Sequence, residues 1–402
     1  MDFDDTPAEA AFRAEARAWL DAHATRREEG AGFGGYLSRA EDHVEACKRW
    51  QRTLYDGGWA GITWPKEYGG RGATPIEAAI FNQEQAHYDV DAGVFMVAVG
   101  MVGPTLIAHG TDAQKERFLD PLLRGDEIWC QLFSEPGAGS DLANLATRAV
   151  LDGDEFVVNG QKVWTSGAQH SDWGILLVRS DPEVPKHKGI TYLLVDMRSP
   201  GIDVRPLRQI NGVAHFNEVF LSDVRVPKQN MLGELHQGWG PILTTLANER
   251  SAIGGGGGIR FDHLAGLART TGRAGDPLTR QELARAYTRY ELIRYVGYRV
   301  QTALSQGRPP GPESSTLKLA YSQHLAATAD LVLAMEGAGG TLDGDDALAG
   351  GVWQTYFLGQ WASRIGGGTD QIQRNVLGER VLGLPPEPRL DKAVPFRDLP
   401  KS

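Results

Sequence analysis

The spacing of apolar and polar residues divides the chain into a helical start, a strand-rich middle and a helical end. In the first part, apolar residues recur at helical spacing behind the capping pair Thr6-Pro7. Near Trp129 the pattern changes to short runs rich in β-branched and aromatic residues, which are typical of strands. Helical spacing returns after Gly238. This order of helices, strands and helices predicts an α+β fold.

The same pattern places the individual elements. Helices are predicted at 44–54, 75–87, 92–109 and 112–123, and again at 242–250, 281–306, 314–336 and 371–381. Strands are predicted at 155–158, 173–178, 190–195, 202–206 and 219–226, with Asp152-Gly153 and Asn159-Gly160 as hairpin turns. The predicted domains are 1–128 (helical), 129–232 (a small β-barrel or sandwich), 233–384 (a helical bundle) and 385–402 (an extended, proline-rich surface tail).

Composition and charge exclude several classes of protein. The chain has 402 residues, of which 41% are hydrophobic and 23% charged, as in a soluble globular protein. Its net charge of -10 argues against nucleic acid or an anionic membrane surface as a partner. The acidic start does not resemble a signal peptide, and no run of 18 apolar residues occurs, so a cytoplasmic protein is expected.

The candidate metal ligands lack the spacing of a metal site. Cys47 and Cys130 are the two cysteines, and they are expected to be buried free thiols in a reducing compartment. His170, His215 and His236 are isolated in the sequence and are interpreted as surface or loop residues. No metal is therefore expected.

The stretch Cys130–Asp141, which reads CQLFSEPGAGSD, forms a glycine-rich loop after an apolar run. Such a loop can bring its N–H groups close to a flat or anionic ligand, but taken alone it can equally be a plain connector. Two more motifs follow, WTSG at 164–167 and GGTDQIQRN at 367–375. Together and in this order, the three motifs resemble those of the acyl-CoA dehydrogenase family over nearly the whole chain. The resemblance implies a helical domain, a β domain and a four-helix-type bundle.

The resemblance also implies an FAD site between the β domain and the C-terminal helices. The residues that would contact FAD are Gln131, Phe133, Ser134, Ser140, Trp164, Ser166, Gly368, Thr369 and Gln371. An aromatic face packed on a planar ring is a physical reason for Trp164, although a core aromatic at the end of a strand is the alternative. Arg269 could contact the pyrophosphate or could be a solvated charge at a helix end. Its loop lacks the phenylalanine of the family pattern, so the cross-subunit half of the site is not implied by the motifs.

The implied reaction needs a carboxylate near the α-carbon of an acyl thioester. Many family members carry this base directly before the Gly-Thr of the last motif, where this chain has Gly367. A second family solution places a glutamate on the helix after the β domain, directly before an arginine, as in Glu249-Arg250. Glu249 is therefore predicted to be the base, and Gly367 to give a backbone N–H to the thioester oxygen. Arg250 would meet the CoA end of the substrate. An ordinary Glu-Arg pair on a helix surface is the alternative.

The substrate and the partners are less sharply indicated. Five glycines at 254–258 could make room for a bulky, branched or steroid-type acyl group, or could break the helix or allow close backbone packing. Ser140 and Phe95 are further candidates for substrate binding, and core packing explains Phe95 equally well. The implied partners are acyl-CoA and an electron-transfer flavoprotein as electron acceptor. The implied assembly is a homotetramer or a mixed tetramer with a related subunit.

Two functions follow from these residues. The first is FAD-dependent α,β-desaturation of an acyl-CoA thioester. The alternative is a non-catalytic or half-site subunit of a heteromeric acyl-CoA dehydrogenase. Relatives with other flavin chemistry, such as oxygenases and nitroalkane-type oxidases, tend to lose the glutamate base, whereas Glu249 is present here.

Overall fold

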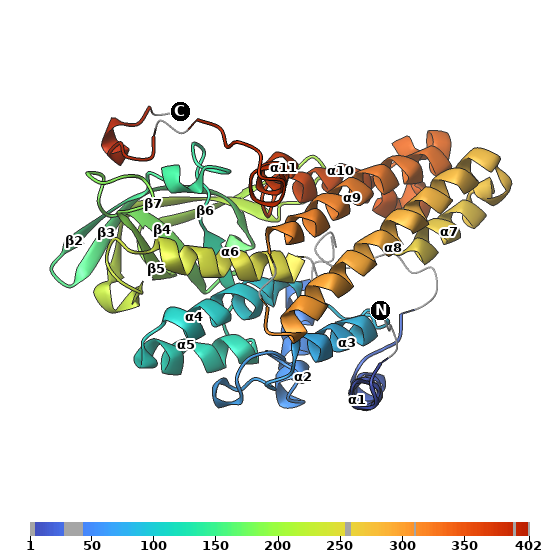
Figure 1. Cartoon of the computed structure of the whole chain (residues 1–402), viewed down its shortest axis with the longest axis horizontal. Helices are drawn as coiled ribbons and strands as arrows, with labels where there is room; N and C mark the ends of the chain where they lie inside the picture. The colour runs from blue at the N-terminus through green and yellow to red at the C-terminus, as the bar shows by residue number, and fades with distance from the viewer. Residues whose placement is uncertain (1–4, 28–42, 254–258, 309–310, 389–390, 401–402) are drawn as a thin grey trace. The chain divides into compact units, whose positions relative to one another are not determined.

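The computed structural model of the chain describes residues 5–27, 43–253, 259–308, 311–388 and 391–400 (Figure 1). The chain forms two compact units. The first unit combines Met1–Arg39, Ala73–Asp91 and Ile253–Pro386, and the second combines Ala40–Gly72, Ala92–Ala252 and Glu387–Ser402. The glycine stretches at 30–35 and 254–258 lie outside the described residues. Helices and one sheet together confirm the α+β class.

The first unit is helical. Its α-helices are α1 (Pro7–His23), α3 (Pro75–Gln85), α7 (Phe261–Thr270), α8 (Pro277–Ser305), α9 (Ser315–Glu336), α10 (Val352–Ile365) and α11 (Asp370–Val376). Helix α9 packs against α8, α10 and α11, while α1 packs against α3 (Figure 1). Apolar side chains from α7, α8, α9 and α10 form the core between them, among them Leu267, Ala286, Val332 and Trp353.

The described residues of the second unit form the sheet and four α-helices. The helices are α2 (His43–Asp56), α4 (Gly103–His109), α5 (Asp112–Arg124) and α6 (Trp239–Ile253). The strands are β1 (Trp129–Leu132), β2 (Arg148–Asp152), β3 (Glu155–Ser166), β4 (Trp173–Arg179), β5 (Ile190–Asp196), β6 (Ile202–Leu207), β7 (Phe216–Pro227) and β8 (Met231–Leu232). They follow the order β6-β7-β3-β2-β4-β5-β8, and β1 pairs in parallel with β4. One buried core draws side chains from six of these strands, which gives the sheet its barrel-like character.

Two expectations about local structure are corrected. The predicted turn at Asn159-Gly160 is wrong, because β3 runs through both residues with a bulge between Val158 and Gly160. A Cβ atom at Gly160 would lie 2.5 Å from Thr147 Oγ1, so a glycine allows the close approach of the neighbouring chain. The apolar pattern also missed the helices α7 and α10. Helix α10 begins after Gly351, which has a left-handed backbone with a φ of 78°.

Other expectations are confirmed. Cys47 and Cys130 are buried and take part in no disulfide among the described residues, and burial raises the pKa of Cys130 to about 12, which makes its thiol unreactive. The expected helix start at Thr6-Pro7 is confirmed, because Thr6 begins α1 with a capping box; Thr74, which was not predicted, begins α3 in the same way. Trp64 anchors its glycine-rich loop by packing so closely on Gly103 that a Cβ atom there would collide with the indole ring. Among the helices of the described residues, none is long and apolar enough to cross a membrane.

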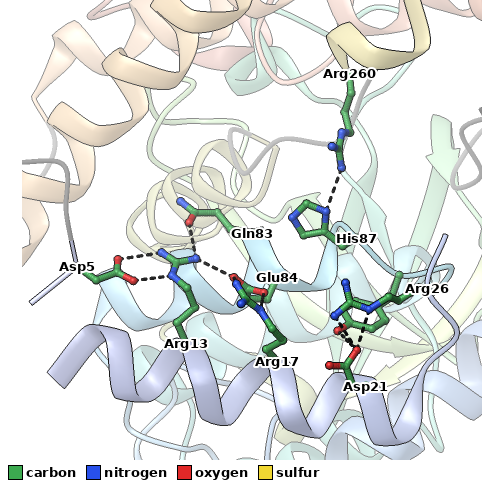
Figure 2. Close-up of polar contacts among 10 residues, drawn as sticks. Asp5, Arg13, Arg17, Asp21, Arg26, Gln83, Glu84, His87 and Arg260 are labelled. Atoms are coloured by element: carbon green, nitrogen blue, oxygen red, sulfur yellow. Dashed lines mark hydrogen bonds and ion pairs between the residues drawn. The ribbon is translucent and has the colours of Figure 1, made fainter. Parts of the chain in front are cut away.

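A polar cluster joins α1 to α3 in the first unit (Figure 2). Glu84 on α3 is only 4% exposed, and its carboxylate accepts hydrogen bonds from Arg13 Nη1 at 3.0 Å and from Arg17 Nε at 2.9 Å. Arg13 also donates to Asp5 and to Gln83. Burial alone would raise the pKa of Glu84, but the two guanidinium groups bring it below its ordinary value.

We predict that Glu84→Gln lowers the free energy of unfolding by about 2 kcal/mol at neutral pH, because three charge-assisted hydrogen bonds from Arg13 and Arg17 are weakened. The folded-state pKa of Glu84 lies below its ordinary value of 4.5. Its contribution is therefore complete above that value and is lost as the pH falls through the folded-state pKa. Denaturation of both proteins between pH 7 and pH 3 checks this, and the difference should shrink toward the acid end.

The matched control for this prediction is Glu282→Gln, which removes the solvent-exposed partner of Arg285 on α8. An exposed ion pair contributes little, so this change should cost less than about 0.5 kcal/mol at every pH. Equal losses for the two variants would show that the buried carboxylate at Glu84 has no special role.

Candidate active site

The motif loop, residues 133–141, is tied to strand β3 by a buried ion pair. Lys162 on β3 is fully buried, and its ammonium donates to Glu135 Oε1 at 2.7 Å and to the Phe133 carbonyl at 3.1 Å. The Val163 N–H donates to the Ser134 carbonyl at 2.9 Å. Three contacts from neighbouring residues of one strand therefore fix the start of the loop.

Glu135 is held by the backbone as well as by Lys162. Its two carboxylate oxygens accept hydrogen bonds from the N–H groups of Ala146 at 2.7 Å and Thr147 at 2.9 Å. Burial would raise the pKa of Glu135, but Lys162 and the hydrogen bonds together lower it. The charged carboxylate of Glu135 thus links the motif loop to the chain that leads into β2.

Trp164 lies on β3 two residues after Lys162, and its backbone has an unusual conformation. Its backbone has a φ of 61°, a left-handed conformation that is rare for a bulky residue, at a bulge between β3 and β7. Its indole is 61% exposed and meets Phe216 edge-on, with ring centroids 5.9 Å apart. Such strain at an exposed aromatic is typical of a ligand site. Ser166, two residues further, is half-buried and pairs with Phe216 of β7.

Helix α6 places Glu249 beside β1, the strand that precedes the motif loop. One turn before Glu249, buried Thr245 contacts the Tyr192 hydroxyl of β5 at 3.1 Å and the Thr105 hydroxyl of α4 at 3.0 Å. Residues four apart share a helix face, so Glu249 lies on the face that Thr245 fixes. There Gln131 Nε2 donates a long hydrogen bond of 3.4 Å to Glu249 Oε2. The structure therefore brings the predicted base beside a predicted flavin contact.

Phe133 belongs to the same group. It is 4% exposed and packs edge-on against Tyr192, with centroids 5.9 Å apart. Ser134 is half-buried at the start of the loop, whereas Ser140 is exposed near its end. Phe95 is buried, and its ring lies close to Gly125 in the helical part of the second unit, which favours the core-packing alternative.

The residues of the last motif belong to the first unit. Thr369 caps α11 by accepting the Ile372 N–H at 3.1 Å, and Gln371 is exposed on its first turn. Gly367 and Gly368 have φ values of 62° and 83°, and their carbonyls accept hydrogen bonds from Gln373. Arg269 is exposed in the last turn of α7. Arg250 lies on α6.

Asp370, the first residue of α11, fixes the turn at Gly367 and Gly368 through buried contacts. It is 1% exposed and accepts hydrogen bonds from Ser322 Oγ at 2.5 Å and Arg364 Nε at 3.2 Å. Burial would raise its pKa, but these partners and Lys318 hold it below the ordinary value. Reasoning from the sequence missed Asp370, Lys162, Glu135 and Thr245. Only Glu135 and Asp370 carried a signal, because both stand inside the motifs.

Comparison with known proteins identifies the family. Family models match residues 6–126, 130–224 and 236–382, as the N-terminal, middle and C-terminal domains of acyl-CoA dehydrogenase. The chain is 39% identical over 381 residues to "Acyl-CoA dehydrogenase IpdE1" of Mycobacterium tuberculosis, covering 94% of this chain and 98% of that one. The chain belongs to the acyl-CoA dehydrogenase family. As such it is an oxidoreductase that acts on acyl-CoA.

Solved structures of the family agree with this fold. A structure titled "Tcur3481-Tcur3483 steroid ACAD" superposes with a TM-score of 0.81 at 32% identity, covering 96% of this chain and all of that chain (100%). The ChsE4-ChsE5 complex from Mycobacterium tuberculosis superposes with a TM-score of 0.78, also at 32% identity, with 96% and 100% of the two chains covered. The predicted fold class is therefore confirmed.

Acyl-CoA dehydrogenases imply a flavin cofactor, and the second unit fits one. A planar, partly apolar ring needs an aromatic surface that the protein core has not covered, and Trp164 offers such a surface. It also needs close backbone approach, and a Cβ atom at Gly139 would have no heavy atom within 4 Å. Trp164 and the motif loop are joined through the Lys162 contacts, so both could hold one ring.

We predict that Lys162→Met lowers the free energy of unfolding by about 3–5 kcal/mol, because it leaves the Glu135 carboxylate buried without its counter-charge. The double variant Lys162→Met/Glu135→Gln should be less destabilised than Lys162→Met alone, because the glutamine is neutral and still offers an oxygen to the backbone N–H groups. Urea unfolding of the set measures the coupling. Strictly additive losses would contradict a direct ion pair.

Proposed function

We propose that this acyl-CoA dehydrogenase carries out FAD-dependent α,β-desaturation of an acyl-CoA thioester, with Glu249 as the base. The observation that carries the proposal is the position of Glu249. It stands on a helix pinned by Thr245, and its carboxylate meets Gln131 of β1 directly before the motif loop. Gly367 leaves no carboxylate at the other family position for the base.

In this proposal Glu249 removes a proton from the α-carbon of the thioester. Gln131 orients the carboxylate by donating to Oε2, and the rigid setting of α6 keeps it in place. The N–H of Gly367 would stabilise the charge that develops on the thioester oxygen. FAD supplies, when bound, the two-electron acceptor for the hydrogen lost from the β-carbon. Trp164, Ser166 and the backbone of residues 131–134 would hold its ring.

The acyl group that we propose is bulky, branched or steroid-type. Support comes from the solved relative titled "steroid ACAD", which this chain matches at 32% identity over nearly its full length. For the assembly we favour a mixed tetramer with a related subunit. Two solved relatives are titled as pairs of unlike chains, Tcur3481 with Tcur3483 and ChsE4 with ChsE5. An electron-transfer flavoprotein is the proposed electron acceptor.

We predict that Glu249→Gln reduces kcat by at least about a hundredfold, the usual contribution of general-base catalysis, while the protein keeps its flavin. An amide has nearly the shape of a carboxylate but cannot accept the proton. The matched control is Glu116→Gln, at an exposed position on α5 in the same unit, which should turn over like the wild type. Full turnover by Glu249→Gln would exclude Glu249 as the base.

Glu249→Gln in a mixed assembly also distinguishes a catalytic subunit from the alternative, a non-catalytic or half-site subunit. If this chain carries the catalytic base, Glu249→Gln should abolish desaturation also when the related subunit is present. If the partner carries the base, the mixed assembly should remain active with the variant. Mass measurement of the chain purified alone and with its partner tells a homotetramer from a mixed one.

We further predict that adding CoA thioesters to the flavin-loaded wild type bleaches the flavin absorption band, and more completely with a steroid-type or branched acyl group than with a short linear one. Bleaching reports reduction of the flavin by the substrate, so it needs no electron acceptor. Stronger bleaching by short linear thioesters would overturn the proposed acyl group and leave the proposed reaction intact.

A further inference from the structure

The C-terminal strap, residues 391–400, lies on the second unit beside the chain that follows β4. The Phe396 N–H donates to the Val184 carbonyl at 2.9 Å, and the Arg397 N–H donates to the Pro182 carbonyl at 3.0 Å. An isolated β-bridge joins Pro395 to Pro185. The proline-rich tail was expected to be an extended surface segment, and this part of it is held by specific backbone contacts.

Lys186 connects the strap to the motif loop. Its ammonium forms an ion pair with Asp141, the last residue of the loop, at 2.7 Å, and a second ion pair with Asp391 of the strap. The side chain of Lys186 is only 10% exposed. Its charge holds the pKa of Asp391 below the ordinary value, in keeping with a formed pair. One cation therefore ties an aspartate of the strap to the residue next to Ser140.

Arg179 at the end of β4 makes a second connection. Its guanidinium lies 4.0 Å from the centre of the Phe396 ring, a cation–π contact that covers it from one side. The same group donates to the carbonyls of Ala143 at 2.6 Å and Lys186 at 2.8 Å. Arg179 is 3% exposed, so these bonds are formed in a site largely closed to water. The contacts of the strap through Lys186 and through Arg179 therefore both reach residues close to Ser140, namely Asp141 and Ala143.

The loop has a further restraint before Ser140, because Ala138 is buried and exchanges two backbone hydrogen bonds of 3.0 Å with Glu135. Pro136, Gly137, Gly139 and Ser140 are exposed, and Ser140 lies between this closed turn and Asp141, which Lys186 holds. An open cavity of about 760 Å³ is lined by Glu135 and Gly137 of the loop and by Phe396 and Leu399 of the strap. The strap is thus one wall of the space behind the loop, and its loss would also admit water toward Glu135.

We propose that the strap is a positioning element for the cofactor and substrate loop, and that it acts through Lys186 and Arg179 to hold Ser140 where it contacts the pyrophosphate of FAD and the acyl-CoA. The inference rests on the proposed function and on Ser140 being the FAD and substrate contact that the family resemblance implies. The strap residues do not touch the reacting atoms. They should change the affinity for cofactor and substrate and leave the chemical step of the loaded enzyme unchanged.

The test uses the full chain with Asp391→Asn and Phe396→Ala combined, which remove the strap's contacts to Lys186 and Arg179. Hydrogen–deuterium exchange should speed up about tenfold at the amides of residues 137–145, and the Kd of the apoprotein for FAD should rise about tenfold, the equivalent of one weak ion pair plus one cation–π contact. KM for acyl-CoA should rise, while kcat at saturation stays the same. The matched control is Lys392→Ala, an exposed cation of the same strap.

Two further results decide the proposal. Asp391→Glu keeps the carboxylate and should restore most of the FAD affinity lost in Asp391→Asn. The proposal is overturned if the double variant exchanges and binds FAD like the wild type, or if kcat falls while the Kd for FAD stays constant. A wild type that binds no flavin would instead refute the proposed function. The exchange measurement would then still report whether the strap orders the loop.

Discussion

The buried contact between Lys162 and Glu135 is the constraint on which the rest of the second unit depends. Removing two charges from water is expensive, and their attraction compensates only when the remaining hydrogen-bonding groups are also satisfied. Here they are satisfied, because Glu135 accepts two backbone N–H groups and Lys162 donates to the Phe133 carbonyl. The motif loop, the chain that leads into β2 and the part of β3 directly before Trp164 are therefore joined into one piece. An exposed, strained tryptophan can keep its position only on such a base.

Helix α6 holds the carboxylate of Glu249 against Gln131 of β1 and leaves it half-buried. Its apolar and hydroxyl side chains do this by contacts one turn earlier, where Thr245 joins β5 and α4 and Thr244 joins His109 at 2.8 Å. A carboxylate on a helix with such contacts is held more firmly than one on a loop. In the first unit a buried carboxylate has a comparable structural role, because Asp370 at the start of α11 accepts a hydrogen bond from Ser322 of α9.

The parts of this structure that the sequence predicts are those with a local signal. The capping pair Thr6-Pro7 lies directly at the start of the helix it predicts, and the motif around Ser134–Asp141 can be read in one stretch. The missed features depend on distant partners. Asn159-Gly160 has the composition of a turn, but the glycine is needed because Thr147 approaches closely from the chain that leads into β2. Lys162 looks like a surface residue of a strand until Glu135, 27 residues earlier, is placed beside it.

The strap is a second case in which a distant segment fixes the motif loop. A glycine-rich loop can approach a ligand closely because it lacks side chains, and for that reason it also lacks the contacts that would order it. In this chain two backbone hydrogen bonds between Glu135 and Ala138 order the first turn of the loop, and further contacts from outside the loop hold it on both sides. Glu135 is held by Lys162 from within the sheet, and Asp141 is held by Lys186, whose second partner is Asp391 of the strap. A segment far from the motif in sequence thereby sets how much freedom Ser140 retains.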